Sequence, residues 1–188
     1  PEGNVGITRV HLEEDTGKNL HKTIERNPTS PQGLRGARKV TLIDFNRSGV
    51  PLVEIVTEPD IHSAEEAKAF AAELHRLMVY AGVTHGDLYH GNMRFDVNVS
   101  VALKGATELG RRAEVKNLNS FRSVEKAAEY EFKRQVELLE KGERIVQETR
   151  GWDEAKQKTN SQRSKEDAQD YRYMPDADIP PIVLSDEE

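Results

Sequence analysis

Residues 93–101, MRFDVNVSV, alternate apolar and polar side chains without interruption. Successive side chains of a β-strand point to opposite faces of its sheet, so this period predicts a strand with one buried face and one polar face. Residues 111–119, RRAEVKNLN, alternate in the same way around Ala113 and Val115. The chain is therefore expected to contain a sheet whose strands present polar side chains on one face.

Two segments carry apolar residues at helical spacing, and each lies between a serine and a glycine. Ser63 precedes the first, with Glu66 three residues later to complete a capping box, and Gly82 follows it. Ser120 precedes the second segment and Gly142 follows it. These signals predict two helices, each of which begins after its serine and ends before its glycine.

Other strands are expected at residues 5–14, 39–44, 51–57 and 144–152, where β-branched and apolar residues alternate or cluster. Between the second and third of these, NRSG at residues 46–49 is typical of a tight turn. The two flanking strands are therefore expected to form a hairpin.

Turns or loops are expected where this periodicity is lost. Residues 15–22 are predicted to be a turn, and residues 23–38, rich in Pro, Gly and Arg, a loop or flap. Residues 153–170 are polar and aperiodic, which predicts a loop or lid, and residues 171–188 are Pro-rich and expected to be extended. The order strands, helix, strands, helix, strand favours an α+β domain with a largely antiparallel sheet.

Composition excludes several classes of function. The net charge of -6, from 27 Lys and Arg against 33 Asp and Glu, argues against a chain-wide basic surface that binds nucleic acid by counterion release alone. The chain has no Cys, which excludes disulfides and thiolate metal sites but leaves oxygen-liganded metals possible. No apolar run approaches the roughly 20 residues of a membrane span, so we expect no membrane partner and a cytoplasmic location, or an organellar matrix in a eukaryote.

Polar residues of an unusual kind lie on the expected strands, which carry carboxylates, Asn and basic residues rather than Thr and Ser. They are Glu14, Glu54, Asp96, Asn98, Glu114, Lys116, Glu148 and Arg150. Carboxylates on neighbouring strands repel one another, and Mg²⁺, which prefers a few carboxylates, waters and substrate phosphates, would relieve that repulsion. The basic residues would then contact phosphate oxygens. These residues alone leave two alternatives open, a metal and phosphate site or an ordinary solvated sheet face.

Neither a P-loop glycine signature nor a Gly-x-Ser-x-Gly nucleophile motif is present, so those two mechanisms are excluded.

The stretch LIDFNRSGVPLVEIVTEPD, residues 42–60, resembles the signature of the B subunit of the aspartyl/glutamyl-tRNA amidotransferases. Other segments resemble the same family in the same order along nearly the whole chain. They are VGITRVHLEEDTGK, MRFDVNVSV, AEVKNLNSFRSVEKAAEYE, QETRGWDE and DYRYMPDADIPP.

This resemblance implies a cradle similar to the glutamine synthetase and guanido kinase fold, with an antiparallel sheet and helices on one face that binds ATP and Mg²⁺. It also implies a ligase that phosphorylates the side-chain carboxylate of Glu or Asp misacylated on tRNA. Ammonia released from glutamine by an amidase partner then displaces the phosphate, which gives Gln-tRNA(Gln) or Asn-tRNA(Asn). A small third subunit is expected to hold the other two together.

By position, the resemblance implies four carboxylates with catalytic and metal-binding roles: Glu14, Glu54, Asp96 and Glu114. His11 is implied as a further metal-shell residue. Lys116, Asn98 and Arg150 are implied to contact phosphate or substrate.

The chain also departs from the family pattern. Tyr89 and His90 replace acidic residues, residues 27–39 form an insertion, and MPDADIPP replaces a Phe-Pro-Glu-Pro pattern. Residues 1–188 are expected to be the C-terminal portion of the catalytic cradle domain, without the family's N-terminal strands and C-terminal tRNA-binding helical domains. The isolated piece is therefore expected to be inactive.

Two rival functions remain from the sequence. The chain could belong to an ATP-dependent ligase or kinase of the same fold that acts on a free small carboxylate. Alternatively, it could be a non-catalytic scaffold that binds tRNA or the amidase.

Overall fold

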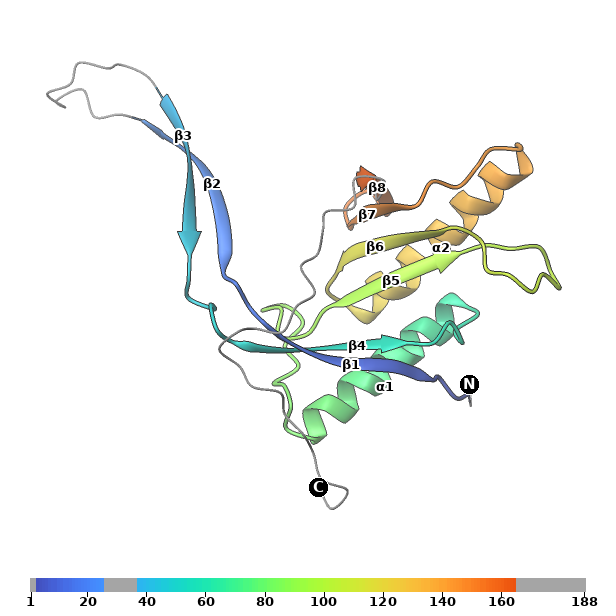
Figure 1. Cartoon of the computed structure of the whole chain (residues 1–188), viewed down its shortest axis with the longest axis horizontal. Coiled ribbons are helices and arrows are strands. Elements are labelled where there is room, and N and C mark those ends of the chain that lie inside the picture. Colours follow the sequence, from blue (N-terminus) through green and yellow to red (C-terminus); the bar gives the residue numbers. More distant parts are fainter. Residues whose placement is uncertain (1–2, 26–36, 165–188) are drawn as a thin grey trace, which may run out of the picture. The chain divides into compact units, whose positions relative to one another are not determined.

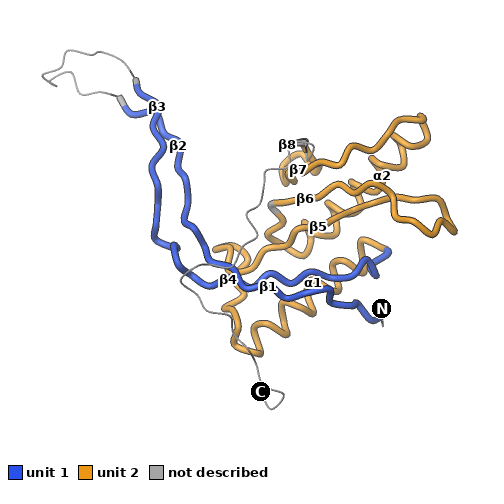
Figure 2. The backbone as a smooth tube through the Cα atoms, viewed as in Figure 1, with its two compact units in different colours: residues 1–62 blue, residues 63–188 orange. Residues whose placement is uncertain are grey.

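The computed structural model describes residues 3–25 and 37–164. The chain divides into two compact units, residues 1–62 and residues 63–188, which Figure 2 shows in different colours. Most of the insertion at residues 27–39 and all of MPDADIPP lie outside the described residues, as does the extended segment expected at residues 171–188.

The first unit consists of two antiparallel strand pairs, visible in Figure 1. Its strands are β1 (Ile7–Glu14), β2 (Lys18–Glu25), β3 (Ala37–Asp44) and β4 (Pro51–Thr57). β1 pairs with β4, and β2 pairs with β3. Where the pairs meet, Asp15 N donates to Val50 O at 2.9 Å and Gly49 N donates to Asp15 O at 2.9 Å. These hydrogen bonds join the two ladders, so β1 and β2 run together opposite β3 and β4.

The predicted hairpin of residues 39–44 with residues 51–57 is wrong, because β3 and β4 pair with β2 and β1 and not with each other. A local turn does form, with Ser48 N donating to Phe45 O at 2.9 Å. However, Asp15 bonds across the base of this turn, so the chain resumes along the same ribbon instead of folding back on itself.

β2 occupies Lys18–Glu25, where a turn and a loop were predicted. Its pattern, KNLHKTIE, lacks a clear period because a ribbon of two strands has no buried face to select one. The preceding strand β1, which pairs with β4, likewise has no buried face, since all eight of its residues are exposed.

The second unit is a four-stranded sheet with its second helix packed on one face and its first helix packed against that second helix. Its elements are α1 (Ala64–Tyr80), β5 (Phe95–Ser100), β6 (Arg112–Leu118), α2 (Phe121–Glu140), β7 (Glu148–Asp153) and β8 (Lys158–Ser164). The strand order is β5-β6-β7-β8, and only the β6–β7 pair in this sheet is parallel. α2 connects those two strands, as a parallel pair requires a crossover connection. The α+β class and the predominantly antiparallel pairing are thus confirmed for the described residues.

Both predicted helix caps are confirmed. Ser63 Oγ accepts from Glu66 N at 3.1 Å while Ser63 N donates to Glu66 Oε2 at 3.2 Å, which completes the capping box. Ser120 Oγ accepts from Ser123 N at 3.0 Å at the start of α2. Gly82 and Gly142, just after the helices, have φ of +72° and +75°.

Neither helix is long and apolar enough to cross a membrane, and these are the two helices of the described chain.

The loop predicted over residues 153–170 is wrong for the part that forms β8, an edge strand paired with β7. A turn at residues 154–157 joins the two strands, and β7 lies at Glu148–Asp153 rather than at residues 144–152. β8, KTNSQRS, is polar because it lies at the sheet edge, where Thr159 is its one buried residue among those with described side chains. An edge strand with a single buried position leaves no alternation for sequence reasoning to detect.

The core of the second unit lies between α2 and the sheet. Ala113 and Val115 of β6 are fully buried, and Ala127 of α2 is buried with them. Because side chains alternate along a strand, Glu114 and Lys116 lie on the opposite face of the sheet, away from α2.

Candidate functional site

Three charged side chains meet on the sheet face opposite α2. Lys116 Nζ of β6 lies 3.1 Å from Asp96 Oδ2 of β5 and 3.7 Å from Glu114 Oε1. The Asp96 and Lys116 side chains are 44% and 41% exposed, whereas Glu114 is 17% exposed. We call Asp96, Glu114 and Lys116 the carboxylate–lysine cluster. The cluster combines two carboxylates with the ammonium group of Lys116, at a surface that a solute can reach.

Two further residues adjoin this cluster. Asn98 lies opposite Glu114 in the β5–β6 register, which places both on the same face of the sheet. Thr149 of β7 lies opposite Glu114 on the other side, and its Oγ1 donates to Glu114 Oε2 at 3.1 Å. Thr149 was not among the predicted site residues. A signal was present in the QETRGW segment, because adjacent strand residues point to opposite faces and only one of Thr149 and Arg150 can therefore face Glu114.

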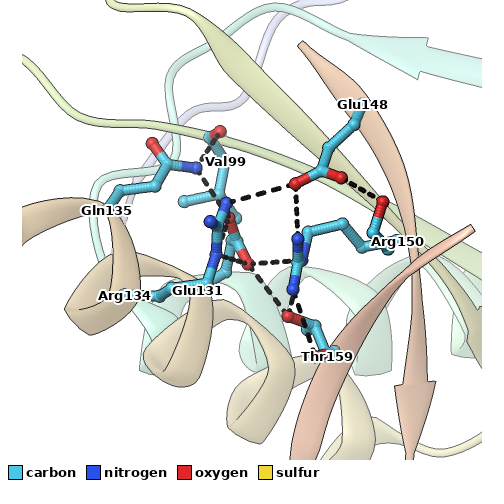
Figure 3. Close-up of polar contacts among 8 residues, drawn as sticks. Val99, Glu131, Arg134, Gln135, Glu148, Arg150 and Thr159 are labelled. Carbon is cyan, nitrogen blue, oxygen red and sulfur yellow. Dashed lines mark hydrogen bonds and ion pairs between the residues drawn. The ribbon is translucent and has the colours of Figure 1, made fainter. Parts of the chain in front are cut away.

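Arg150 does not join the cluster, although it was predicted to act with Glu114 and Lys116. Thr149, not Arg150, is the residue of β7 that faces Glu114, so the next side chain points to the face that α2 covers. There Arg150 Nε donates to Thr159 Oγ1 at 2.8 Å, and the guanidinium also bonds Glu148. The Arg150 side chain is only 11% exposed. Glu148 and Arg150 thus belong to a structural contact between sheet and helix (Figure 3).

Glu131 of α2 lies at the centre of that contact and is fully buried. Arg134 Nε donates to it at 3.0 Å, Gln135 Nε2 at 3.0 Å and Thr159 Oγ1 at 3.2 Å (Figure 3). Burial alone would lower the pKa of Arg134, but the hydrogen bond and charge of Glu131 raise it above its ordinary value. We call Glu131, Arg134, Glu148 and Arg150 the buried ion network. Its two carboxylates and two guanidinium groups balance in charge.

The other implied site residues lie in the first unit. His11 of β1 is opposite Glu54 of β4, and Arg9 Nη2 lies 3.7 Å from Glu54 Oε2. Glu14 is opposite Pro51, and because side chains alternate along β1, it lies on the other face of the ribbon from His11 and Glu54. The structure therefore pairs His11 with Glu54 and separates Glu14 from both.

The implied metal ligands are thus divided between the two units, with Asp96 and Glu114 in the second. Among residues 3–25 and 37–164, no three His, Asp or Glu side chains converge as metal ligands. Asp96 and Glu114 fit a different mode, since Mg²⁺ is usually held by one or two carboxylates together with waters and substrate phosphates.

Tyr89 and His90, which depart from the family pattern, line a pocket of about 280 Å³ in the second unit. Arg94, one residue before β5, lines it too. His90 Nδ1 lies 2.7 Å from Asp87 Oδ2, and this hydrogen bond lowers the pKa of Asp87. At these two positions the pocket is therefore lined by Tyr89 and by His90, which Asp87 holds, rather than by two acids.

A sequence model of the family described as the GatB/GatE catalytic domain matches residues 1–188, the whole chain. The B subunit of an aspartyl/glutamyl-tRNA(Asn/Gln) amidotransferase from Gloeobacter violaceus is 53% identical over 185 residues, which are 98% of this chain and 32% of that protein. The B subunit of the amidotransferase of the same name from Caldicellulosiruptor saccharolyticus is 52% identical over 182 residues, which are 97% of this chain and 35% of that protein.

The chain therefore corresponds to only part of each relative. The resemblance to the amidotransferase B subunits that its motifs indicate is confirmed, since the similarity covers nearly every residue. This chain belongs to the GatB/GatE catalytic domain family.

Proposed function

We propose that the chain is the ATP-dependent catalytic part of a tRNA-linked amidotransferase. In this reaction the side-chain carboxylate of Glu or Asp misacylated on tRNA is phosphorylated and then amidated. The observation that carries the proposal is the carboxylate–lysine cluster, which lies on an accessible sheet face in a member of this family. The names of the relatives support the substrate class.

The chemistry requires charge neutralisation. A carboxylate resists attack by ammonia, so one of its oxygens first attacks the γ-phosphorus of ATP, the bond to the β–γ bridging oxygen breaks, and ADP leaves. Ammonia then adds to the carbonyl carbon of this acyl phosphate, inorganic phosphate departs with its C–O electron pair, and a proton is lost to give the amide. Negative charge is concentrated at the phosphoryl group throughout, and cations aimed at it lower the barrier.

Residue roles follow from the donor set. Asp96 and Glu114 would hold Mg²⁺, which when bound neutralises phosphate charge, and Lys116 would turn from the carboxylates toward a phosphate oxygen. Asn98, on the same face, has an amide able to donate to the nucleotide or substrate. We assign Arg150 to the buried ion network instead, because its guanidinium is engaged by Glu148 and Thr159.

We also propose metal or phosphate-site roles for three residues of the first unit, Glu14, Glu54 and His11. Their carboxylates and imidazole are suitable metal or phosphate-site groups, and His11 and Glu54 lie opposite each other on one face of the ribbon. We propose further that ammonia comes from an amidase partner that hydrolyses glutamine, and that a small third subunit joins the two.

The test uses the assembled amidotransferase that contains this chain. Asp96→Asn and Glu114→Gln should each reduce tRNA-dependent ATP hydrolysis and amidation by about 100-fold or more, the scale for removing a charge-stabilising group. Glu73→Gln is the matched control, since Glu73 is an exposed carboxylate of α1 paired with Arg76, and it should leave both rates unchanged.

Two outcomes would favour the rival functions. Full amidation by both site variants would indicate a non-catalytic scaffold. ATP turnover driven by free glutamate or aspartate, without tRNA, would indicate a ligase or kinase for a small carboxylate.

A further inference from the structure

The hydroxyl of Thr149 is buried beneath the carboxylate–lysine cluster. Thr149 is only 3% exposed, and its Oγ1 donates to Glu114 Oε2 at 3.1 Å. The other carboxylate oxygen, Glu114 Oε1, faces Lys116 Nζ at 3.7 Å. One oxygen of Glu114 thus accepts a hydrogen bond from the buried Thr149 hydroxyl, and the other faces the ammonium group of Lys116.

The strand that carries Thr149 is itself held from its opposite face. The next residue, Arg150, bonds Thr159 of β8 at 2.8 Å, and its Nε lies 3.5 Å from Glu131 Oε2 of α2 (Figure 3). Thr149 and Arg150 thus point to opposite faces, and the parallel β6–β7 ladder, rather than the buried ion network, sets the Thr149 hydroxyl beside Glu114.

We propose that Thr149 is a positioning residue that orients the Glu114 carboxylate for a divalent cation. The inference rests on the proposed function, which makes Glu114 a metal-site carboxylate. A glutamate side chain has several rotatable bonds, and a fixed donor at one oxygen removes most of their freedom before the cation arrives. Hydrogen-bond partners of this kind commonly change metal affinity by roughly 10- to 100-fold.

If the Thr149 hydroxyl served only stability, its removal would leave Mn²⁺ affinity unchanged. Two matched substitutions separate this structural role from the positioning role. Thr149→Val keeps the shape of the side chain and removes the donor, whereas Thr149→Ser keeps the donor. Thr159→Val is the control, since Thr159 is also 3% exposed and donates to a carboxylate, Glu131, but on the helix-covered face.

The experiment measures Mn²⁺ binding by electron paramagnetic resonance in the assembled amidotransferase with ADP present, together with kcat and the KM for ATP. Thr149→Val should weaken Mn²⁺ binding by roughly 10- to 100-fold and lower kcat, and Thr149→Ser should restore both. Thr159→Val should lower the thermal midpoint without changing Mn²⁺ affinity. If Thr149→Val does not assemble, Thr149→Ala removes the same hydroxyl without an added methyl group and gives the same readout.

The inference is overturned if Thr149→Val or Thr149→Ala binds Mn²⁺ like the parent protein while Glu114→Gln does not, and in that case the proposed function stands. If Glu114→Gln itself retains Mn²⁺ binding and amidation, the metal role of Glu114 fails and the positioning role of Thr149 fails with it.

Discussion

Arg150 of β7 and Glu131 of α2 meet inside the second unit, with Arg150 Nε 3.5 Å from Glu131 Oε2. Glu131 is fully buried, and every charge in the buried ion network has an opposite charge nearby. Such an arrangement is costly to form because both ions lose water, yet it is more costly to break, because removal of one partner leaves a buried charge unpaired.

Glu131→Ala should therefore destabilise the protein strongly, by about 3–5 kcal/mol, since the largely buried guanidinium groups of Arg134 and Arg150 then share the single carboxylate of Glu148. Urea unfolding of the full-length protein measures this change. Glu129→Ala is the control two residues earlier, where a carboxylate that is 39% exposed pairs with Lys126 and Lys133, and its effect should be much smaller. Equal effects of the two substitutions would contradict the role assigned to the network.

The sequence predicted the helices and missed the ion network for the same physical reason. Helix ends depend on local signals, and Ser63, Ser120 and the following glycines carry them within a few residues. Glu131 and Gln135 follow Ala127 at intervals of four, on the buried face of α2, but their polar character hides them from a search for apolar spacing. Arg134 of α2 itself and partners on β5, β7 and β8, distant in sequence, make those positions tolerable.

The candidate site was partly predictable, because alternation alone indicates that Asp96, Asn98, Glu114 and Lys116 lie on polar strand faces. Alternation does not say which strands are neighbours, or which face of β7 matches the polar face of β6. The parallel β6–β7 register decides that Thr149 and not Arg150 reaches Glu114, and register depends on packing against α2. The ribbon strand β2 and the edge strand β8 were missed because neither has a buried face that imposes a period.

Lys116→Met should separate activity from stability. Its ion pairs with Asp96 and Glu114 are partly exposed, so their loss should change the unfolding free energy by less than about 1 kcal/mol. Amidation should nevertheless fall severely if Lys116 contacts phosphate. Lys68→Met is the matched control, because Lys68 pairs with Glu125 at 2.8 Å and is similarly exposed, and its activity should be unchanged. Equal activity of the two variants, from steady-state assays of the assembled enzyme, would remove Lys116 from the site.

Glu154→Gln should reveal a pH-dependent contribution at the start of α2. Hydrogen bonds from Trp152 Nε1 at 2.6 Å and Ser123 Oγ at 3.0 Å lower the pKa of Glu154 below its ordinary value of 4.5. A lowered folded-state pKa means that the ionised carboxylate stabilises the protein above about pH 4.5 and that this stabilisation is lost as the pH falls through the folded-state pKa. The variant should be less stable than the parent at pH 7, by only a few tenths of a kcal/mol, because solvent screens an exposed carboxylate.

Urea unfolding from pH 7 down to pH values well below the ordinary pKa measures this difference. The gap between parent and Glu154→Gln should narrow as the pH falls, because the parent then loses the same charge. A gap that stays constant with pH would show that the carboxylate charge contributes nothing there.

Ser63→Ala should destabilise α1 by about 1 kcal/mol, because it removes the acceptor for Glu66 N and half of the reciprocal capping box. Ser63→Gly should cost only a few tenths of a kcal/mol, since glycine is itself tolerated at this position of a helix. Hydrogen exchange of the first-turn amides measures the effect locally, and the amide of Glu66 should lose the most protection in Ser63→Ala. The capping role would be refuted by first-turn amides that exchange equally fast in the parent and in both variants.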